Sequence, residues 1–301
     1  MSGGRQFGLR RRCALRHSGR ARIIEAMPND AGKRTSSPWN RRVNRAEELA
    51  TQHAFASELL LFYAQIARFQ GELYSRLEGA SISARGPQPG MASGPPELPE
   101  LVESFPRFLK MIEQHAPREL AGFARELQSA PEQARAEFLN NFWSGTHESE
   151  VADLSEFPSR AFLQPYAEFV RLRSGMQWDG YTCSLCPFCN RKPGMGVLRQ
   201  QGDGGSRSLI CSFCLAEWQF RRILCPSCGE ENHAKLPVFT AEELPHVRVE
   251  CCDTCKRYTK TVDLTKNGLA EPVVDEIAAV PLDLWAQGRG YSKLQANLLQ
   301  M

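Results

Sequence analysis

Four Cys-x-x-Cys pairs between residues 186 and 255 constrain the fold of this chain more than any other feature of its sequence. One such turn presents two thiolates to a tetrahedral ion, so two turns together complete a closed four-sulfur site. The spacing leaves room for short antiparallel strands between two turns. The simplest interpretation is two metal sites in tandem, although interleaved pairing of the turns also fits. The eight candidate ligands are Cys186, Cys189, Cys211, Cys214, Cys225, Cys228, Cys252 and Cys255.

The first and third pairs repeat one local sequence. Cys-Pro-Phe-Cys-Asn at residues 186–190 corresponds to Cys-Pro-Ser-Cys-Gly at residues 225–229. Asn and Gly tolerate a left-handed backbone better than other residues, so the position after each second cysteine predicts a tight turn. Cys183 and Cys251 offer overlapping registers, but neither fits this repeat. We therefore leave both out of the ligand set.

A soft four-sulfur tetrahedron suits either iron or zinc, so the pattern predicts iron (or zinc) in two tetrahedral sites of four cysteines each. Zinc would serve as a scaffold only, whereas iron would allow a one-electron change on an unaltered fold. Four thiolates leave no open coordination position for a reacting group. The sequence also carries no nucleophile elbow, no Gly-rich phosphate loop before a helix and no His-Glu-x-x-His motif. We predict that the chain is not an enzyme and has no small-molecule substrate.

The charge of the chain is unevenly distributed. Residues 1–45 carry twelve basic and two acidic residues, a net +10, which leaves −7 for the rest of a chain whose net charge is +3. An acidic body is a poor surface for nucleic acid, so we expect no nucleic-acid partner. Residues 1–40 are rich in Arg, Gly and Ser, which predicts a disordered basic tail; a start at Met27 is the alternative. No apolar run reaches the length of about 18 residues that a membrane span needs.

Residues 41–175 have the apolar periodicity of an all-α domain. The first expected helix runs from Val43 to Leu77, and its apolar stripe is more typical of a core than of a cofactor site. A loop rich in Gly and Pro follows at residues 79–99. Further helices are expected from about Leu98 to Ile112, with a kink at Pro106, and then at Pro117–Gln128, Pro131–Trp143 and Pro158–Arg173.

The periodicity changes after Gly175, where short strand patterns alternate with turns. They predict two tandem rubredoxin-like (zinc-ribbon-like) modules at residues 180–222 and 223–268, followed by a helical tail at residues 269–301 with a break near Pro281. The predicted fold class is therefore α+β. The expected strands are Val197–Gln201, Arg207–Ile210, Trp218–Leu224, Val238–Thr240, Val247–Glu250 and Thr259–Leu264.

The order of these motifs resembles one known family, the formate dehydrogenase accessory protein FdhE. The second cysteine pair is followed by Glu217-Trp218, and the C-terminal end shows the family's pattern at residues 263–264, 274–276, 282–283 and 290–291, with Asn297 downstream. The resemblance implies a cytoplasmic, non-catalytic maturation factor. It implies contact with the molybdenum- or tungsten-containing catalytic subunit of formate dehydrogenase, and iron or zinc in rubredoxin-like sites formed by the four cysteine pairs.

Four residues are candidates for contact with that partner: Trp218, Asp283, Trp285 and Tyr291. Aromatic side chains dominate the energetics of protein interfaces. Trp218 could equally fill the core between the two modules. His233 and His246 lie between cysteine pairs, but we interpret them as surface or hydrogen-bonded residues and not as ligands. The competing hypothesis for the whole chain is a rubredoxin-like electron carrier or redox sensor that uses iron tetrathiolate sites.

Overall fold

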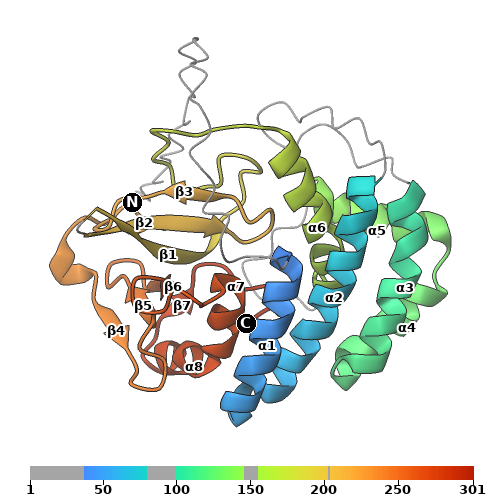
Figure 1. Cartoon of the computed structure of the whole chain (residues 1–301), viewed down its shortest axis with the longest axis horizontal. Helices are drawn as coiled ribbons and strands as arrows, with labels where there is room; N and C mark the ends of the chain where they lie inside the picture. The colour runs from blue at the N-terminus through green and yellow to red at the C-terminus, as the bar shows by residue number, and fades with distance from the viewer. Residues whose placement is uncertain (1–36, 80–98, 146–154, 203) are drawn as a thin grey trace, which may run out of the picture. The chain divides into compact units, whose positions relative to one another are not determined.

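The computed structural model describes residues 37–79, 99–145, 155–202 and 204–301. The predicted basic tail therefore lies almost entirely outside the described residues. The described N-terminal part is helical, and a single β-sheet with two further helices follows it (Figure 1). The α+β fold class is thus as predicted. The helices are α1 (Pro38–Gln52), α2 (Ser57–Gly79), α3 (Pro99–His115), α4 (Arg118–Ser129), α5 (Glu132–Trp143), α6 (Phe157–Arg173), α7 (Pro272–Ala278) and α8 (Val280–Gly288).

The long first helix expected from the sequence is two helices. His53 leaves the helical conformation with φ −124° and ψ 86°, and a 3-10 turn at Ala54–Ala56 leads into α2. Helices α1 and α2 pack against each other, so the turn between them lets α2 fold back onto α1. The apolar stripe of α2 is buried as predicted. The prediction missed the break because residues 52–56 contain neither Gly nor Pro to mark it.

Aromatic side chains fill the core of the helical domain. Phe162 of α6 lies at its centre, with ring centroids 4.8 Å from Phe105, 5.6 Å from Phe108 and 6.4 Å from Phe69. The first two belong to α3 and the third to α2, so one buried ring contacts two other helices.

None of the helices in the described part of the chain has both the length and the apolar character that a bilayer crossing requires.

The strands of both predicted modules form one sheet, in the order β3-β2-β1-β6-β5-β4, with β7 paired to β6. Antiparallel hairpins build each end, and the parallel pair β1–β6 joins them. The expected strand at Trp218–Leu224 is shorter, because only Glu217–Gln219 pairs with β2. The strands are β1 (Pro193–Gln201), β2 (Gly204–Cys211), β3 (Glu217–Gln219), β4 (Val238–Thr240), β5 (Val247–Cys251), β6 (Arg257–Asp263) and β7 (Ser292–Lys293).

The junction between the two halves of the sheet depends on a glycine. Gly196 of β1 is the register partner of Thr261 of β6. A Cβ at Gly196 would lie 2.3 Å from the Thr261 hydroxyl oxygen and 3.2 Å from the Thr261 Cβ, which is too close for any side chain. The Thr261 side chain thus occupies the space that a side chain at residue 196 would need, which explains the glycine inside this strand.

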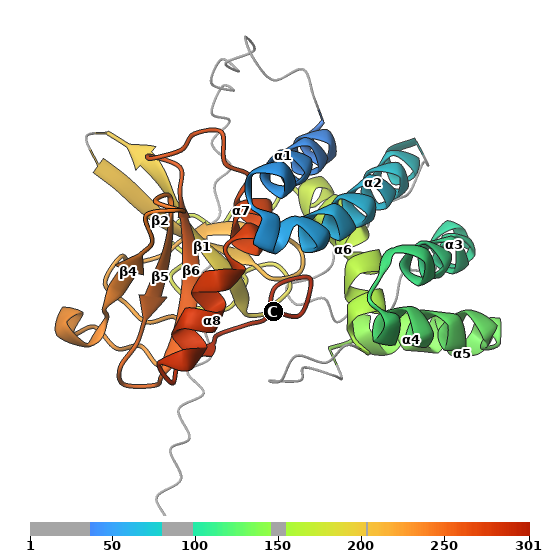
Figure 2. The same cartoon turned by 90° about the horizontal axis from the view of Figure 1, so that it is seen from below.

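Helix α7 connects the sheet to the helical domain. It contacts β6 on one side and α1 on the other (Figure 2). Asp275 of α7 accepts hydrogen bonds from the Arg45 guanidinium of α1 at 3.0 and 2.6 Å, and it lies 2.7 Å from Nε2 of His246. Burial raises the pKa of Asp275, but the bonds from His246 and Arg45 outweigh it and the pKa is lowered. His246 is therefore a hydrogen-bonded residue, as the sequence suggested.

A buried ion network holds the C-terminal helices and tail on the sheet. The Lys260 ammonium of β6 donates to Asp283 at 2.6 Å and lies 3.0 Å from the Glu276 carboxylate. Lys293 also donates to Glu276, and the Asn297 amide donates to its other oxygen at 2.9 Å. Two cations and two carboxylates balance each other in this network. Such groups tolerate burial only when they are paired and hydrogen-bonded.

We predict that Gly196→Ala lowers the free energy of unfolding by about 2 kcal/mol, because overpacking at a closed contact forces the backbone apart. Gly204→Ala in β2 is the matched control, since nothing lies within 4 Å of its Cβ position. It should change stability by less than about 0.5 kcal/mol. Chemical unfolding of the full chain measures both variants. Equal stability of the two would contradict the close approach of β1 and β6.

The buried carboxylate of Glu276 should make the stability of the chain depend on pH. Burial raises the pKa of Glu276, but the ammonium groups of Lys260 and Lys293 outweigh it and lower the pKa to about 2 from 4.5. A carboxylate with a lowered pKa contributes stability above its unfolded pKa and loses it as the pH falls through the folded value. At neutral pH, Glu276→Gln should cost about 3 kcal/mol, because it leaves buried ammonium groups without their partner.

The stability difference between wild type and Glu276→Gln should therefore shrink as the pH falls from about 5 toward 2. Urea unfolding across this range measures it, with the exposed Glu242→Gln as a control that should follow the wild type. A difference that stays constant or widens toward low pH would contradict this assignment.

Candidate metal centres

The eight predicted cysteines lie in two groups of four. Cys186, Cys189, Cys211 and Cys214 form the first site, and Cys225, Cys228, Cys252 and Cys255 form the second site. Within each group all four sulfurs lie within 4.8 Å of one another. The pairs therefore combine in sequential order, and the interleaved alternative does not occur. Neither Cys183 nor Cys251 belongs to either group.

The sulfur spacing fits a tetrahedral ion. In the first site the Sγ atoms of Cys186 and Cys214 lie 3.5 Å apart, and those of Cys189 and Cys211 lie 3.3 Å apart. In the second site the corresponding distances are 3.7 and 3.6 Å. Metal–sulfur bonds of about 2.3 Å place the corners of a tetrahedron about 3.8 Å apart. The donor set and its geometry therefore suit a soft ion such as zinc or iron.

The same backbone turn presents the sulfurs in every pair. The residue after the second cysteine has a positive φ in all four turns, at Asn190 (60°), Leu215 (54°), Gly229 (78°) and Lys256 (55°). The prediction for Asn190 and Gly229 is confirmed. Leu215 and Lys256 have no sequence signal for this conformation, since it is unfavourable for residues with a Cβ. The geometry of the turn therefore overrides the local preference at these two positions.

Backbone amides point at the sulfurs from inside the turns. Phe188 N–H donates to Cys186 Sγ at 3.4 Å, and Phe213 N–H does the same for Cys211 at 3.4 Å. In the second site, Ser227 N–H donates to Cys225 Sγ at 3.4 Å. Amide donors favour the thiolate form of a cysteine, which is the form that binds a metal ion.

The first site is part of the helical core. All four of its cysteines are buried, and they share one hydrophobic cluster with side chains of the helical domain. Phe213, between the two cysteines of the second pair, is fully buried, with its ring 5.2 Å from Phe142 and 6.1 Å from Trp143. The Arg191 guanidinium lies over both phenylalanine rings. The helical domain therefore covers the first site.

Two arginines of α6 hold the turn of the second cysteine pair, Cys211 and Cys214, through hydrogen bonds to its carbonyl oxygens. Arg171 donates to the Cys214 carbonyl at 2.9 Å, and Arg160 donates to the Ser212 carbonyl at 3.1 Å. Arg160 also donates to the carbonyls of Ala296 and Asn297 in the C-terminal tail. Burial lowers the pKa of Arg160 to about 10, which keeps it protonated at neutral pH. These supporting residues lie far from the cysteines in sequence and gave no signal in it.

The second site is more accessible. Cys228 is exposed and Cys255 is partly exposed, while Cys225 and Cys252 are buried. Its strands pack against α8 in a hydrophobic cluster separate from the helical core.

Three of the four candidate partner contacts are interior residues. Trp218 is 1% exposed and belongs to the hydrophobic cluster that joins the first site to the helical domain, and its indole N–H donates to the Cys183 carbonyl at 3.0 Å. Asp283 is 2% exposed and belongs to the buried ion network. Tyr291 is 8% exposed, and its hydroxyl donates to Asp253 at 2.7 Å. Each has its polar atoms satisfied within the chain.

Trp285 is the candidate contact that remains near the surface. Its ring is partly buried, 4.6 Å from the ring of Phe239 and under the guanidinium of Arg289 at 4.1 Å. The neighbouring Leu284 is 65% exposed. We call Leu284 and Trp285 of α8, together with Arg289 directly after the helix, the α8 face.

By its fold and its sites, the chain belongs to a class of proteins in which a helical domain packs against a sheet and the turns of that sheet form two closed sites of four cysteine sulfurs each. Two family models match the chain in this region: the FdhE central domain at residues 185–222 and the FdhE C-terminal domain at residues 223–300. The chain belongs to the FdhE family.

Similar proteins come from several bacteria, all described as protein FdhE homologs. The one from Aquifex aeolicus (strain VF5) is 28% identical over 268 residues, which is 85% of this chain and 93% of that protein. The one from Pseudomonas putida (strain KT2440) is 28% identical over 275 residues, 86% of each chain. The one from Shewanella oneidensis (strain MR-1) is 28% identical over 216 residues, 67% of this chain and 62% of that protein.

A solved structure has a similar fold. It is the crystal structure of the FdhE protein from Pseudomonas aeruginosa, with a TM-score of 0.63 and 24% sequence identity. The match covers 88% of this chain and 97% of that chain. The arrangement of helices and sheet described above is thus shared with that protein.

The difference in exposure predicts a difference in metal release. When both sites hold an ion, a chelator should remove the ion of the second site first, because Cys228 and Cys255 are accessible and every cysteine of the first site is buried. Absorbance of a metallochromic chelator, followed over time, should show two phases of one ion each. Release of both ions in a single phase would contradict the prediction.

Two variants identify the phases. Cys228→Ser should keep one ion per chain and lose the fast phase, since three sulfurs bind a tetrahedral ion poorly. Cys251→Ser is the matched control: Cys251 is a buried cysteine that belongs to neither group, and its loss should leave two ions bound.

Proposed function

We propose that this chain is a non-catalytic accessory factor in the cytoplasm that is required for active formate dehydrogenase and binds the catalytic subunit of that enzyme. Membership of the FdhE family and the curated FdhE homologs support the proposal. The strongest support for this proposal is the arrangement of the eight cysteines in the structure. Both groups are closed sets of four sulfurs, and a closed tetrathiolate site supports a fold and leaves no position for a substrate.

The eight cysteines are proposed as the ligands of iron or zinc. When bound, the ion cross-links two turns, and iron would add a one-electron change. The chain's own residues position these turns: α6 holds the first site through hydrogen bonds to its carbonyl oxygens, and the other half of the sheet carries the second site. The result is a rigid surface built from hairpins that would be marginally stable alone.

The α8 face is the proposed contact with the catalytic subunit. It combines an exposed leucine with a tryptophan and an arginine, and the last two are among the residue types most enriched at the centre of protein interfaces. The Trp285 ring is already held by Phe239 and Arg289, so little side-chain freedom is lost when a partner covers it.

Co-purification tests the proposal. The metal-loaded full chain should capture the catalytic subunit of formate dehydrogenase from an extract, and Leu284→Asp should reduce the captured amount roughly tenfold. Leu172→Asp on α6 is the matched control, because Leu172 is 53% exposed and undergoes the same change. It should capture as much as the wild type.

The outcomes separate the two parts of the proposal. If the wild type captures no catalytic subunit, the accessory function is wrong. If the wild type and Leu284→Asp capture equal amounts, the function stands but the α8 face is not the contact. Metal content of each variant shows that the fold is retained.

One observation favours a second candidate function. The exposed Cys228 would bring an iron ion in the second site close to solvent, which electron exchange requires. A rubredoxin-like electron carrier or redox sensor is therefore the alternative. Metal analysis of protein prepared without oxygen distinguishes the two, because a protein that carries only zinc cannot transfer electrons at these sites.

A further inference from the structure

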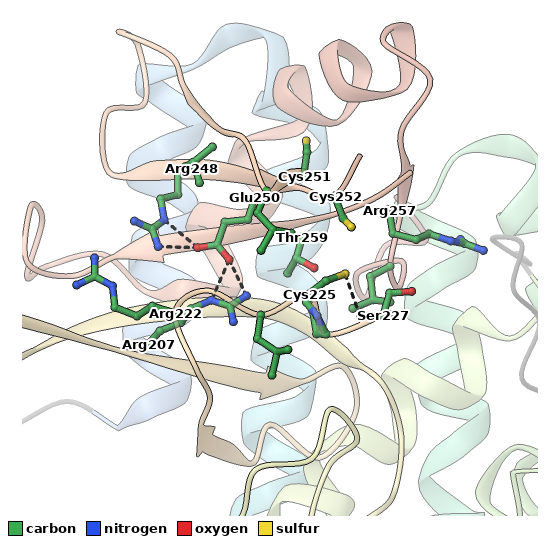
Figure 3. Close-up of a pocket in the computed structure, with 15 residues that line it drawn as sticks. Arg207, Arg222, Cys225, Ser227, Arg248, Glu250, Cys251, Cys252, Arg257 and Thr259 are labelled. Atoms are coloured by element: carbon green, nitrogen blue, oxygen red, sulfur yellow. Dashed lines mark hydrogen bonds and ion pairs between the residues drawn. The ribbon is translucent and has the colours of Figure 1, made fainter. Parts of the chain in front are cut away.

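A cavity of about 490 Å³, including its part open to solvent, lies beside the second site (Figure 3). Its floor is one face of strands β4, β5 and β6, where Val238, Glu250 and Thr259 are cross-strand neighbours. Val247 and Val249 of β5 belong to the cluster that packs against α8 on the opposite face. Arg207 of β2 and residues 222–227 supply the walls.

One end of this cavity carries an excess of positive charge. Arg207 and Arg248 share a single carboxylate: the distances to Glu250 are 2.9 and 2.6 Å from Arg207, and 2.9 and 2.6 Å from Arg248. Arg222 lies on the same side in Figure 3, and its hydrogen bond goes to the Gly205 carbonyl at 3.3 Å. Among the described residues that line the cavity, Glu250 is the one carboxylate. Three guanidinium groups therefore face one negative charge.

This excess lies apart from the thiolates of the second site. Figure 3 shows Cys225 and Cys252 toward the other end of the cavity, with Arg257 beyond them. The Arg207 side chain is almost completely buried, and that of Arg248 largely so. Arg207 and Arg248 are thus buried cations that share one carboxylate, whereas Arg222 is exposed at the rim of the cavity. An anionic ligand between Arg222 and Arg248 would supply a second negative charge to this group.

Five apolar side chains lie among the remaining residues of the lining, beside Ser227, Thr259 and the cysteines. They are Leu224, Pro226, Leu236, Val238 and Leu294. Val238 is half exposed, on a strand that pairs on one side only. A ligand that matches both parts has an anionic head and an aliphatic body. Guanidinium groups bind carboxylates through paired N–H donors, as Arg248 already binds Glu250. Inorganic phosphate would satisfy the charge but not the apolar lining.

We propose that this cavity binds an aliphatic carboxylate, with Arg222 and Arg248 holding the carboxylate and the leucine-lined wall holding the aliphatic part. The carboxylate belongs either to a small free acid or to an acidic side chain of a peptide. Glu250 competes for the Arg248 guanidinium from within the chain. The proposal does not depend on the formate dehydrogenase function.

Ligand titration of the metal-loaded full chain, followed by NMR of the backbone amides, tests the proposal. Butyrate should give saturable shifts confined to β4, β5 and residues 222–227. Arg222→Gln should weaken butyrate binding roughly tenfold, because a charge-assisted hydrogen bond is lost. Arg221→Gln is the matched control: it removes the same charge one residue away, where Arg221 pairs with the exposed Glu231. It should change binding by less than about twofold.

A third variant acts in the opposite direction, so that loss of folding cannot mimic it. Glu250→Gln removes the internal carboxylate and should tighten butyrate binding several-fold. A glutamate residue blocked at both ends distinguishes the two sources: tighter binding than butyrate assigns the site to a peptide side chain, and weaker binding assigns it to a free acid. Non-saturable shifts, equal weakening in Arg221→Gln and Arg222→Gln, or tighter binding of inorganic phosphate than of butyrate would each overturn the proposal.

Discussion

The convergence of four sulfurs on one point, repeated twice, is the constraint on which the C-terminal half depends. Each turn places two thiols at its tip, and two turns must meet before the set is complete. The turns are strained at Leu215 and Lys256, and the strands between them are short. An isolated hairpin has little stability in water, so an ion that cross-links the turns at the ends of these hairpins would contribute directly to the free energy of folding.

The two sites differ in their surroundings and therefore in what they can do. The first lies in the core of the helical domain, with Phe213 among the aromatic side chains and α6 arginines on the carbonyls of its second turn. The second lies at the other end of the sheet, packed against α8 and open at Cys228. The parallel pair β1–β6 and the Arg45–Asp275 ion pair connect these two halves. The structure thus joins a buried, structural site to an accessible one.

Local patterns in the sequence predicted what depends on local physics. The spacing of the cysteines favoured the two groups of four but left an interleaved pairing open, and the repeat predicted the left-handed turns at Asn190 and Gly229. The apolar periodicity gave the helices, apart from the break at His53. Features that depend on distant residues could not be predicted. The pairing of β1 with β6 joins segments far apart in the chain, and Asp283 is buried because Lys260, on another element, neutralises it.

Two ions, each held by four cysteine sulfurs, would organise the whole sheet. X-ray absorption at the metal edge, combined with the metal content of the purified full chain, measures both their number and their ligands. We expect two ions per chain, each with four sulfur ligands at about 2.3 Å. A single ion per chain, or nitrogen or oxygen atoms among the ligands of either ion, would contradict it.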